Sequence, residues 1–206
     1  MKVLLLGPQG CGKGTVGKML SDKYRIPLIS SGQALREVPP HHPRYTELHE
    51  YMDNGLLAPQ DFVASMLRER TSKPDCSNGY IMEGWGRAMI DLKYFDPGYD
   101  KVVVLDIKPE TTISRLSNRR TCRKCGKVFN IVTVPPKVEG KCDECGGDLY
   151  QREDDTESAI KKRLEIYSTE TREVVNHFRD KGILLNVDAE PAPEEVFASV
   201  VSALNS

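Results

Sequence analysis

The glycine-rich segment at residues 7–15 limits what this chain can fold into more than any other part of it. Its sequence, GPQGCGKGT, follows an apolar run at residues 3–6 and precedes residues 15–24, where apolar side chains recur at helical spacing. Backbone N–H groups in a glycine loop between a strand and a helix converge on an anion, and the helix N-terminus adds a positive partial charge. The segment therefore predicts a phosphate-binding loop on a parallel sheet, with Lys13 reaching the β- and γ-phosphates of a nucleotide.

The loop departs at one position from the strict phosphate-loop pattern, which has Ser or Thr directly after the lysine. Here Gly14 follows Lys13, and Thr15 comes next. We expect the Thr15 hydroxyl to bind Mg²⁺, although it lies one residue later than in the strict pattern. The alternative is a tight strand-to-helix turn that binds nothing, which the flanking strand and helix patterns disfavour.

The rest of the chain alternates short apolar runs with helical patterns. Further strands are predicted at residues 26–30, 80–82, 102–107 and 183–187. Longer helices are predicted at residues 111–120, 158–181 and 194–204, and shorter helical pieces, broken by prolines and Gly55, at residues 33–73. Strands alternating with helices predict an α/β fold with a parallel sheet.

The charge balance excludes some classes of partner. The 206 residues carry 29 Lys and Arg against 30 Asp and Glu, for a net charge of −1, whereas general nucleic-acid and anionic-membrane binders have a basic excess. No apolar run approaches the roughly 20 residues that span a bilayer, and the N-terminal segment lacks the apolar region of a signal peptide. We expect a cytoplasmic protein with reduced thiols and with neither a nucleic-acid nor a membrane partner.

Four of the six cysteines form two pairs. Cys122 and Cys125 make one C-x₂-C pair, and Cys142 and Cys145 make the second after 16 intervening residues. A glycine follows each pair, and the surrounding residues 121–155 show no helical period. This spacing predicts a structural Zn²⁺ site that closes an inserted module, because four thiolates complete a tetrahedron and leave no open position. An iron site and four unligated cysteines remain the alternatives.

Several arginines lie next to the ends of predicted elements. Phosphoryl transfer needs positioning and charge neutralisation at both ends of the migrating group, and bidentate guanidinium groups suit that task. Arg115 and Arg119 are predicted to share one helix face. The arginines considered are Arg36, Arg87, Arg119, Arg120, Arg152 and Arg163.

Taken together, these segments resemble the adenylate kinase family in its long form, whose lid carries zinc. The resemblance covers nearly the whole chain and begins with GxxGxGKGT at residues 7–15, where the family has this glycine before the threonine. The other motifs that carry it are ISSG with Leu35-Arg36 at residues 29–36, MDNG at 52–55, RRTC at 119–122, PPKVEG at 135–140, REDD at 152–155 and KRL at 162–164.

The resemblance implies a P-loop NTPase-type fold, in which helices flank a five-stranded parallel sheet and two segments are inserted. Residues 1–29, 59–120 and 157–206 would form the core, residues 30–58 the monophosphate-binding domain, and residues 121–156 the zinc-binding lid. The implied reaction is reversible, Mg²⁺-dependent phosphoryl transfer in a monomer, ATP + AMP ⇌ 2 ADP. Closure of the two inserted domains would exclude water from the reaction.

The resemblance also implies roles for individual residues. Those holding the ATP phosphates would be Gly10, Cys11, Gly12, Lys13, Gly14 and Thr15. Arg119 would approach the ATP, with Val128 and Phe129 against its adenine. Those contacting the acceptor would be Ser31, Gly32, Arg36, Leu56, Leu57, Ala58, Gly84 and Arg87. Arg152 and Arg163 would span the transferring group, which makes the expected catalytic set Lys13, Arg87, Arg119, Arg152 and Arg163.

The chain departs from the family pattern after the third predicted strand. Glu83-Gly84-Trp85-Gly86-Arg87 replaces the family's Asp-Gly-Phe-Pro-Arg; Glu83 keeps a carboxylate for the Mg²⁺ water shell. Four residues after Arg87, Asp91 stands where the family has a glutamine that reads the acceptor adenine. An ionised aspartate can only accept hydrogen bonds, which suits the N1–H and N2–H edge of guanine better. The alternative is that Asp91 points to solvent.

Three interpretations follow from the sequence. The first is a nucleoside monophosphate kinase that uses AMP. The second is the same scaffold with a different or broader acceptor, such as GMP. The third is a catalytically weak nucleotide-binding protein whose zinc module docks a partner; the presence of the complete set of lysine and arginines disfavours it.

Overall fold

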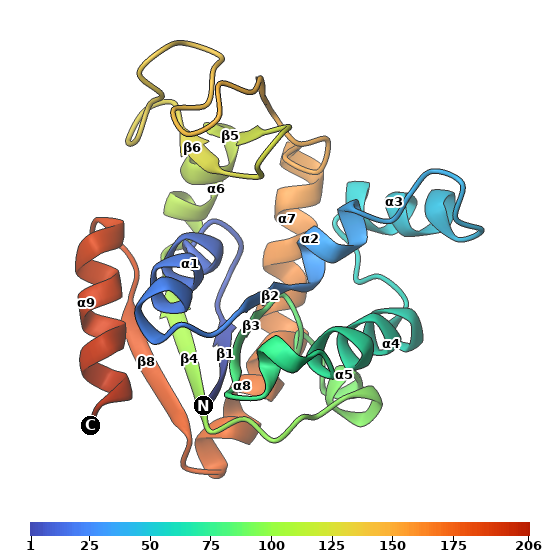
Figure 1. Ribbon diagram of the computed structural model, residues 1–206, viewed down its shortest axis with the longest axis vertical. Coiled ribbons are helices and arrows are strands. Elements are labelled where there is room, and N and C mark those ends of the chain that lie inside the picture. The colour runs from blue at the N-terminus through green and yellow to red at the C-terminus, as the bar shows by residue number, and fades with distance from the viewer.

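The computed structural model describes residues 1–206, and its centre is a parallel sheet of five strands in the order β2-β3-β1-β4-β8 (Figure 1). Leu4 pairs with Met82 on one side and with Val102 on the other. The predicted five-stranded parallel sheet is confirmed. The strands are β1 (Lys2–Leu6), β2 (Leu28–Ser30), β3 (Tyr80–Glu83), β4 (Lys101–Asp106) and β8 (Leu184–Asp188).

Helices cover both faces of this sheet, which explains why its central strands are almost wholly apolar. Neighbouring residues on a strand point to opposite faces. Val3 and Leu5 accordingly join a cluster with α1 (Lys13–Tyr24) and α9 (Pro193–Leu204). Leu4 and Leu6 join a second cluster on the opposite face. That cluster is covered by α4 (Gln60–Thr71) and α8 (Arg172–Asp180), with the short α5 (Met89–Tyr94) packed beside α4.

A helical segment projects from the sheet between β2 and α4. It consists of α2 (Ser31–Arg36) and α3 (Tyr45–Asp53), and Figure 1 shows α3 well away from the strands. The Ser30 hydroxyl caps α2 by accepting a hydrogen bond from the Gln33 N–H at 3.2 Å. At the far end, a Cβ on Gly55 would lie 2.6 Å from the Ala159 carbonyl oxygen, so this segment returns closely against the helix that contains Ala159.

The cysteine-rich segment forms a second, smaller sheet at the other end of the molecule (Figure 1). Its three strands are antiparallel in the order β6-β5-β7. Cys122, Phe129 and Cys142 form its own small buried cluster. The strands are β5 (Arg119–Cys122), β6 (Val128–Asn130) and β7 (Leu149–Tyr150), between α6 (Pro109–Ser117) and α7 (Glu157–Ile166).

Two predicted helices were wrong in extent. The helix predicted at residues 111–120 ends at Ser117, and Arg119 instead begins β5, where it pairs with Asn130. Arg115 and Arg119 therefore do not share a helix face. The long helix predicted at residues 158–181 is interrupted by a π-helical segment, Tyr167–Thr171, between α7 and α8. The sequence analysis also missed α5 and a 3-10 turn at Pro74–Cys76, both too short to show a period.

None of the helices combines the length and the apolar character needed to cross a membrane.

Candidate active site

The loop between β1 and α1 has the conformation that its glycines predict. Gly7, Gly10 and Gly12 all have positive φ values, and Gly12 caps α1 without any side-chain hydrogen bond. A Cβ on Gly7 would lie 2.3 Å from the Leu105 carbonyl oxygen, whereas Cβ atoms on Gly12 and Gly14 would meet nothing within 4 Å. The first N–H groups of α1 have no partner within the helix. The loop thus offers unpaired donors and open space at a helix N-terminus, which suits a phosphate chain.

Lys13 lies across the mouth of this loop. Its Nζ atom donates hydrogen bonds to the carbonyl oxygens of Gly7 at 2.7 Å and Pro8 at 2.9 Å, and it lies 3.4 Å from Cys11 Sγ. No carboxylate pairs with it. A cation held by neutral carbonyl groups keeps its charge available to a bound anion.

The segment after β3 faces the start of α2. Parallel pairing places Glu83 opposite Ser30, and the Ser30 hydroxyl donates a hydrogen bond to Glu83 Oε1. Gly84 has a φ of +84°, and a Cβ there would lie 2.5 Å from Ser31 Oγ. Only glycine allows this close approach, so Gly84 lies directly against Ser31.

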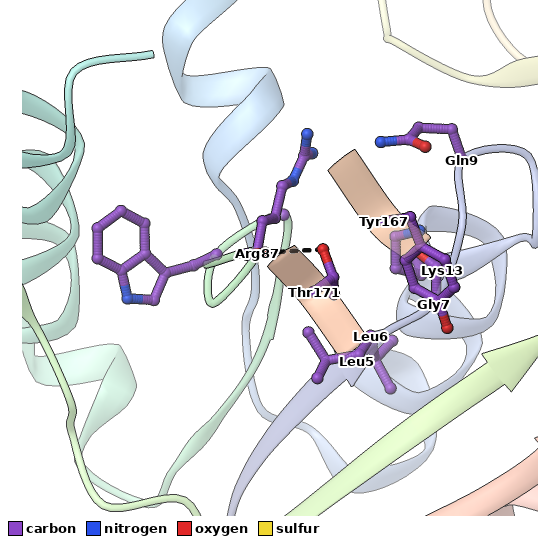
Figure 2. Close-up of a pocket in the computed structure, with 10 residues that line it drawn as sticks. Leu5, Leu6, Gly7, Gln9, Lys13, Arg87, Tyr167 and Thr171 are labelled. Atoms are coloured by element: carbon purple, nitrogen blue, oxygen red, sulfur yellow. Dashed lines mark hydrogen bonds between the residues drawn. The ribbon is translucent and has the colours of Figure 1, made fainter. Parts of the chain in front are cut away.

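Arg87 lines the same cavity as Lys13 of the phosphate loop. Figure 2 shows its guanidinium projecting away from Thr171, whose hydroxyl donates a 2.7 Å hydrogen bond to the Arg87 carbonyl. Lys13, Gly84, Arg87, Tyr167 and six further residues line this cavity. The guanidinium makes no hydrogen bond or ion pair within the protein. Burial, followed by the like charge of Arg163, lowers the pKa of Arg87. This cation is therefore placed to gain from an anionic ligand.

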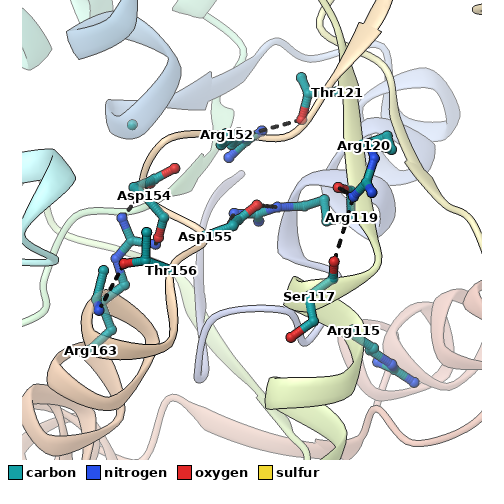
Figure 3. A network of polar contacts seen from close by, with 12 residues as sticks. Arg115, Ser117, Arg119, Arg120, Thr121, Arg152, Asp154, Asp155, Thr156 and Arg163 are labelled. Atoms are coloured by element: carbon teal, nitrogen blue, oxygen red, sulfur yellow. Dashed lines mark hydrogen bonds and ion pairs between the residues drawn. The ribbon is translucent and has the colours of Figure 1, made fainter. Parts of the chain in front are cut away.

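Two further arginines share one carboxylate. Arg163 is 8% exposed and makes an ion pair with Asp154, and Arg36 approaches the same Oδ2 atom at 3.5 Å (Figure 3 shows the Arg163 side). Arg163 also donates to the Met52 carbonyl at 3.1 Å, and Arg36 to the Gly32 carbonyl at 2.7 Å. Burial alone would raise the pKa of Asp154, but Arg163 and Arg36 outweigh it and lower the value to about 2.

A second pair links the start of β5 to the segment before α7. Arg119 donates to both carboxylate oxygens of Asp155, at 2.8 Å for the Nε contact, and the Asp155 side chain is fully buried. Arg152 donates only to the Thr121 hydroxyl, at 3.0 Å (Figure 3). Burial, together with the charges of Arg119 and Arg36, lowers the pKa of Arg152 to about 9. Arg152, like Arg87, has no carboxylate partner within salt-bridge distance.

Two of the arginines considered in the sequence, Arg115 and Arg120, are instead bound to backbone carbonyl groups. Arg120 donates to the carbonyl oxygens of Arg119 and Ser117. Arg115 donates to the carbonyl oxygens of Ala189 and Glu190, beyond β8, and to the Gly10 carbonyl of the phosphate loop at 3.4 Å. Both arginines are occupied by backbone groups.

The structure gives the surroundings of the side chains that the resemblance places near the bases, and it rules out the alternative of a solvent-facing Asp91. The Phe129 ring is 3% exposed and packs inside the small sheet against Cys122 and Cys142, so it offers little surface to an adenine. Val128, its neighbour, is 41% exposed. Asp91 does not point to solvent: it is 4% exposed, and its Oδ2 atom accepts hydrogen bonds from the backbone N–H groups of Arg87 and Ala88.

The sequence analysis assigned no role to Asp154, Asp155 or Thr171. The two aspartates belong to the REDD motif that carried part of the resemblance, so their proximity to Arg152 was visible. The arginines that pair with them could not be predicted, because Arg119 is 36 residues away from Asp155 and Arg36 is 118 residues away from Asp154. Thr171 gave no signal, since it lies inside a region predicted as continuous helix.

The four cysteines of the two C-x₂-C pairs meet in the small sheet. Their sulfur atoms all lie within 4.8 Å of one another, with 3.5 Å between Cys122 and Cys145 and 3.6 Å between Cys125 and Cys142. A zinc–sulfur distance near 2.3 Å places tetrahedral sulfurs about 3.8 Å apart. A Cβ on Gly147 would lie 2.9 Å from Cys122 Sγ, so glycine is needed beside the cluster. The donor set and spacing fit a structural zinc ion.

Comparisons with known proteins agree with this site. A family model described as adenylate kinase matches residues 5–183. The adenylate kinase of Archaeoglobus fulgidus is 39% identical over 99% of this chain and 98% of its own length. The adenylate kinases of Thermodesulfovibrio yellowstonii and Geotalea daltonii are each 40% identical over 99% of both chains.

The family model covers most of this chain and the relatives match it over almost its full length, so the chain belongs to the adenylate kinase family.

Proposed function

We propose that this protein catalyses reversible, Mg²⁺-dependent phosphoryl transfer between ATP and AMP, giving two ADP. The observation that carries the proposal is the cavity lined by both Lys13 and Arg87. These two cations come from opposite sides of the cavity, and neither has a carboxylate partner. A donor phosphate chain on the loop and an acceptor phosphate at Arg87 would be neutralised there at both ends of the transferring group.

At the donor end, residues Gly10 to Thr15 would hold the ATP phosphates through backbone N–H groups. Mg²⁺, when bound with ATP, would supply positive charge that neutralises the charge developing on the phosphates. Thr15 and Glu83 are the residues proposed to hold it and its water shell. Arg119, fixed by Asp155, would contact the donor phosphates, and exposed Val128 would face its adenine.

At the acceptor end, the phosphate of AMP would contact Arg36, Arg87, Arg152 and Arg163. Two of these, Arg36 and Arg163, share Asp154 in the absence of a nucleotide. An incoming phosphate would compete with that carboxylate for the guanidinium groups. The residues proposed around the rest of the nucleotide are Ser31, Gly32, Leu56, Leu57, Ala58 and Gly84.

We further propose that residues 30–58 act as the monophosphate-binding domain and residues 121–156 as the lid. Both segments are inserted between core elements, and the Arg36–Asp154 contact links one to the other across the site. Their closure over bound nucleotides would exclude water and favour transfer over hydrolysis. The zinc would be structural in this lid, and the protein would act in the cytoplasm as a monomer.

The test is ADP formation with ATP and Mg²⁺ against AMP, GMP, CMP and UMP. We expect AMP to be the preferred acceptor, and Lys13→Ala to lower the rate with every acceptor. Absence of ADP with all four acceptors would contradict the proposed activity. A preference for GMP would instead support the second interpretation from the sequence, which no observation of the structure favours.

A further inference from the structure

Asp91 is a buried carboxylate that faces backbone rather than solvent. It lies in the first turn of α5, and its Oδ2 atom accepts hydrogen bonds from the N–H groups of Arg87 at 2.8 Å and Ala88 at 3.2 Å. The Asp91 N–H in turn donates to the Ala88 carbonyl at 3.0 Å. The side chain therefore holds the backbone of the segment that carries Arg87 against the first turn of α5.

The same segment is held from its other side. Thr171, in the π-helical segment, donates a 2.7 Å hydrogen bond to the Arg87 carbonyl oxygen. Arg87 thus has its N–H fixed by Asp91 and its carbonyl fixed by Thr171, while its guanidinium has no protein partner. The two glycines that flank Trp85 both have positive φ values, +84° at Gly84 and +69° at Gly86, so the backbone before Arg87 is intrinsically permissive.

The charged groups around Asp91 favour an anchoring role. Burial raises its pKa and the negative charge of Glu170 adds to that effect, whereas the N–H groups of Arg87 and Ala88 and the charge of Arg87 act in the opposite direction. A buried carboxylate is costly unless its oxygens are satisfied by donors. Here the donors are the backbone of the very residue that the proposed reaction needs.

We propose that Asp91 is a positioning residue, which aims Arg87 at the acceptor phosphate by holding its backbone N–H, and that it does not read the acceptor base. This inference rests on the proposed function, since it assumes that Arg87 contacts the acceptor phosphate. It makes a distinctive prediction, because the phosphate is common to all nucleoside monophosphates. Loss of Asp91 should therefore lower kcat/KM by the same factor for every acceptor.

The experiment measures kcat and KM of Asp91→Ala and Asp91→Asn with AMP, GMP and CMP, and the KM for ATP. For Asp91→Ala we expect kcat/KM to fall about 10- to 100-fold for each acceptor, since small misplacement of a reacting group has effects of that size. The ratios between acceptors and the KM for ATP should stay unchanged. Asp91→Asn keeps an oxygen acceptor and should restore most of the activity.

Two controls separate anchoring from general damage. Asp96→Ala removes a carboxylate that accepts from the Gly98 N–H at 3.0 Å in a loop outside the site, and it should leave all kinetic constants unchanged. In an Arg87→Ala background, Asp91→Ala should have no further effect, because the group that it positions is already gone. The emission of Trp85, the single tryptophan, should shift in Asp91→Ala if the segment loosens.

Each other outcome overturns the inference. A changed ratio between AMP and GMP would make Asp91 a base-reading residue. Unchanged kinetics in Asp91→Ala would leave it without a role. A loss that equally raises the KM for ATP, or that adds fully to Arg87→Ala, would reflect a general structural effect. Absence of activity in the wild-type chain is a separate result and concerns only the proposed function.

Discussion

The cations of the site fall into two groups at the scale of single residues. Arg119 and Arg163 each have a buried aspartate partner, and Arg36 shares Asp154 at longer range. Arg87 and Arg152 have none, and burial lowers the pKa of both. Both side chains are half-buried, and a cation partly removed from water without a counter-charge destabilises the fold. This destabilisation arises at the two positions where a bound phosphate would supply the missing negative charge.

Replacing Arg87 should therefore lower the activity without lowering the stability of the fold. We expect Arg87→Met to keep the free energy of unfolding or raise it by about 1 kcal/mol, because a half-buried, unpaired charge is removed. The same variant should lower kcat/KM for AMP by about 10³-fold or more, the range seen when an arginine is removed from phosphoryl transfer. Urea unfolding and steady-state kinetics measure the two effects. A clear loss of stability would show that Arg87 has a structural partner.

Asp154 gives a pH-dependent prediction. Its folded-state pKa, about 2, lies below its ordinary value of 3.8, so its stabilising contribution is present above pH 4 and is lost as the pH falls through 2. The shift corresponds to about 2 kcal/mol at neutral pH. Asp154→Asn should thus unfold at lower urea concentration than the wild type at pH 6, and the difference should shrink towards pH 2. A constant difference across this range would contradict the ion-pair explanation.

At the scale of elements, the small antiparallel sheet depends on its four cysteines. Its buried cluster consists of only Cys122, Phe129 and Cys142, which is too little apolar surface to fold a segment of this length. A backbone hydrogen bond closes the turn around each pair of cysteines. The Gly126 N–H donates to the Cys122 carbonyl oxygen at 3.0 Å, and the Gly146 N–H donates to the Cys142 carbonyl oxygen at 2.9 Å. Both glycines have positive φ values, as the tight turns require.

Metal removal should unfold this sheet selectively. We expect about one zinc ion per chain and, after chelation, a lower melting temperature and fast hydrogen exchange confined to residues 119–150. Gly147→Ala should weaken zinc retention, because its Cβ would crowd Cys122 Sγ and Lys124 Cβ at 2.9 Å. Gly140→Ala is the matched control in the same segment: it strains a φ of +71° but meets nothing within 4 Å, so it should retain zinc.

At the scale of the whole molecule, the net charge of −1 hides an uneven distribution. Exposed acidic side chains balance the total, while Lys13 and Arg87 line one cavity and Arg152 lines another with Arg36, and none of Lys13, Arg87 and Arg152 has a carboxylate partner. The total charge therefore excludes a broad basic surface, but it does not exclude a site for a small polyanion. Several-kT local potentials of this kind arise from the arrangement of charges and are independent of their sum.

Inorganic phosphate should therefore stabilise the protein. A ligand that binds only the folded chain raises its stability by RT ln(1 + [L]/Kd). We expect the melting temperature to be higher in phosphate than in sodium chloride of equal ionic strength, and the difference to shrink in Arg87→Met and Arg152→Met. Equal melting temperatures for the wild type in both salts would argue against a convergent anion site.

The sequence by itself determined what depends on residues close along the chain. The strand, glycine loop and helix at residues 2–24 follow from local spacing, as do the two cysteine pairs, because each motif closes within one turn or loop. The parallel sheet also followed, since alternating strands and helices leave few arrangements that bury both faces of each strand. Element ends were less predictable: Arg119 entered a strand because Asn130 was there to pair with it.

Only the tertiary structure decided which side chains meet across the site. The Thr171–Arg87 contact joins residues 84 apart, and the Arg36–Asp154 contact joins residues 118 apart. It also turned Phe129 into the small sheet and Asp91 onto the backbone of Arg87, although the resemblance suggested that both lie near a nucleotide base. A residue type restricts which bonds a side chain can make, but the partner is chosen by packing, which brings distant segments together only in the folded chain.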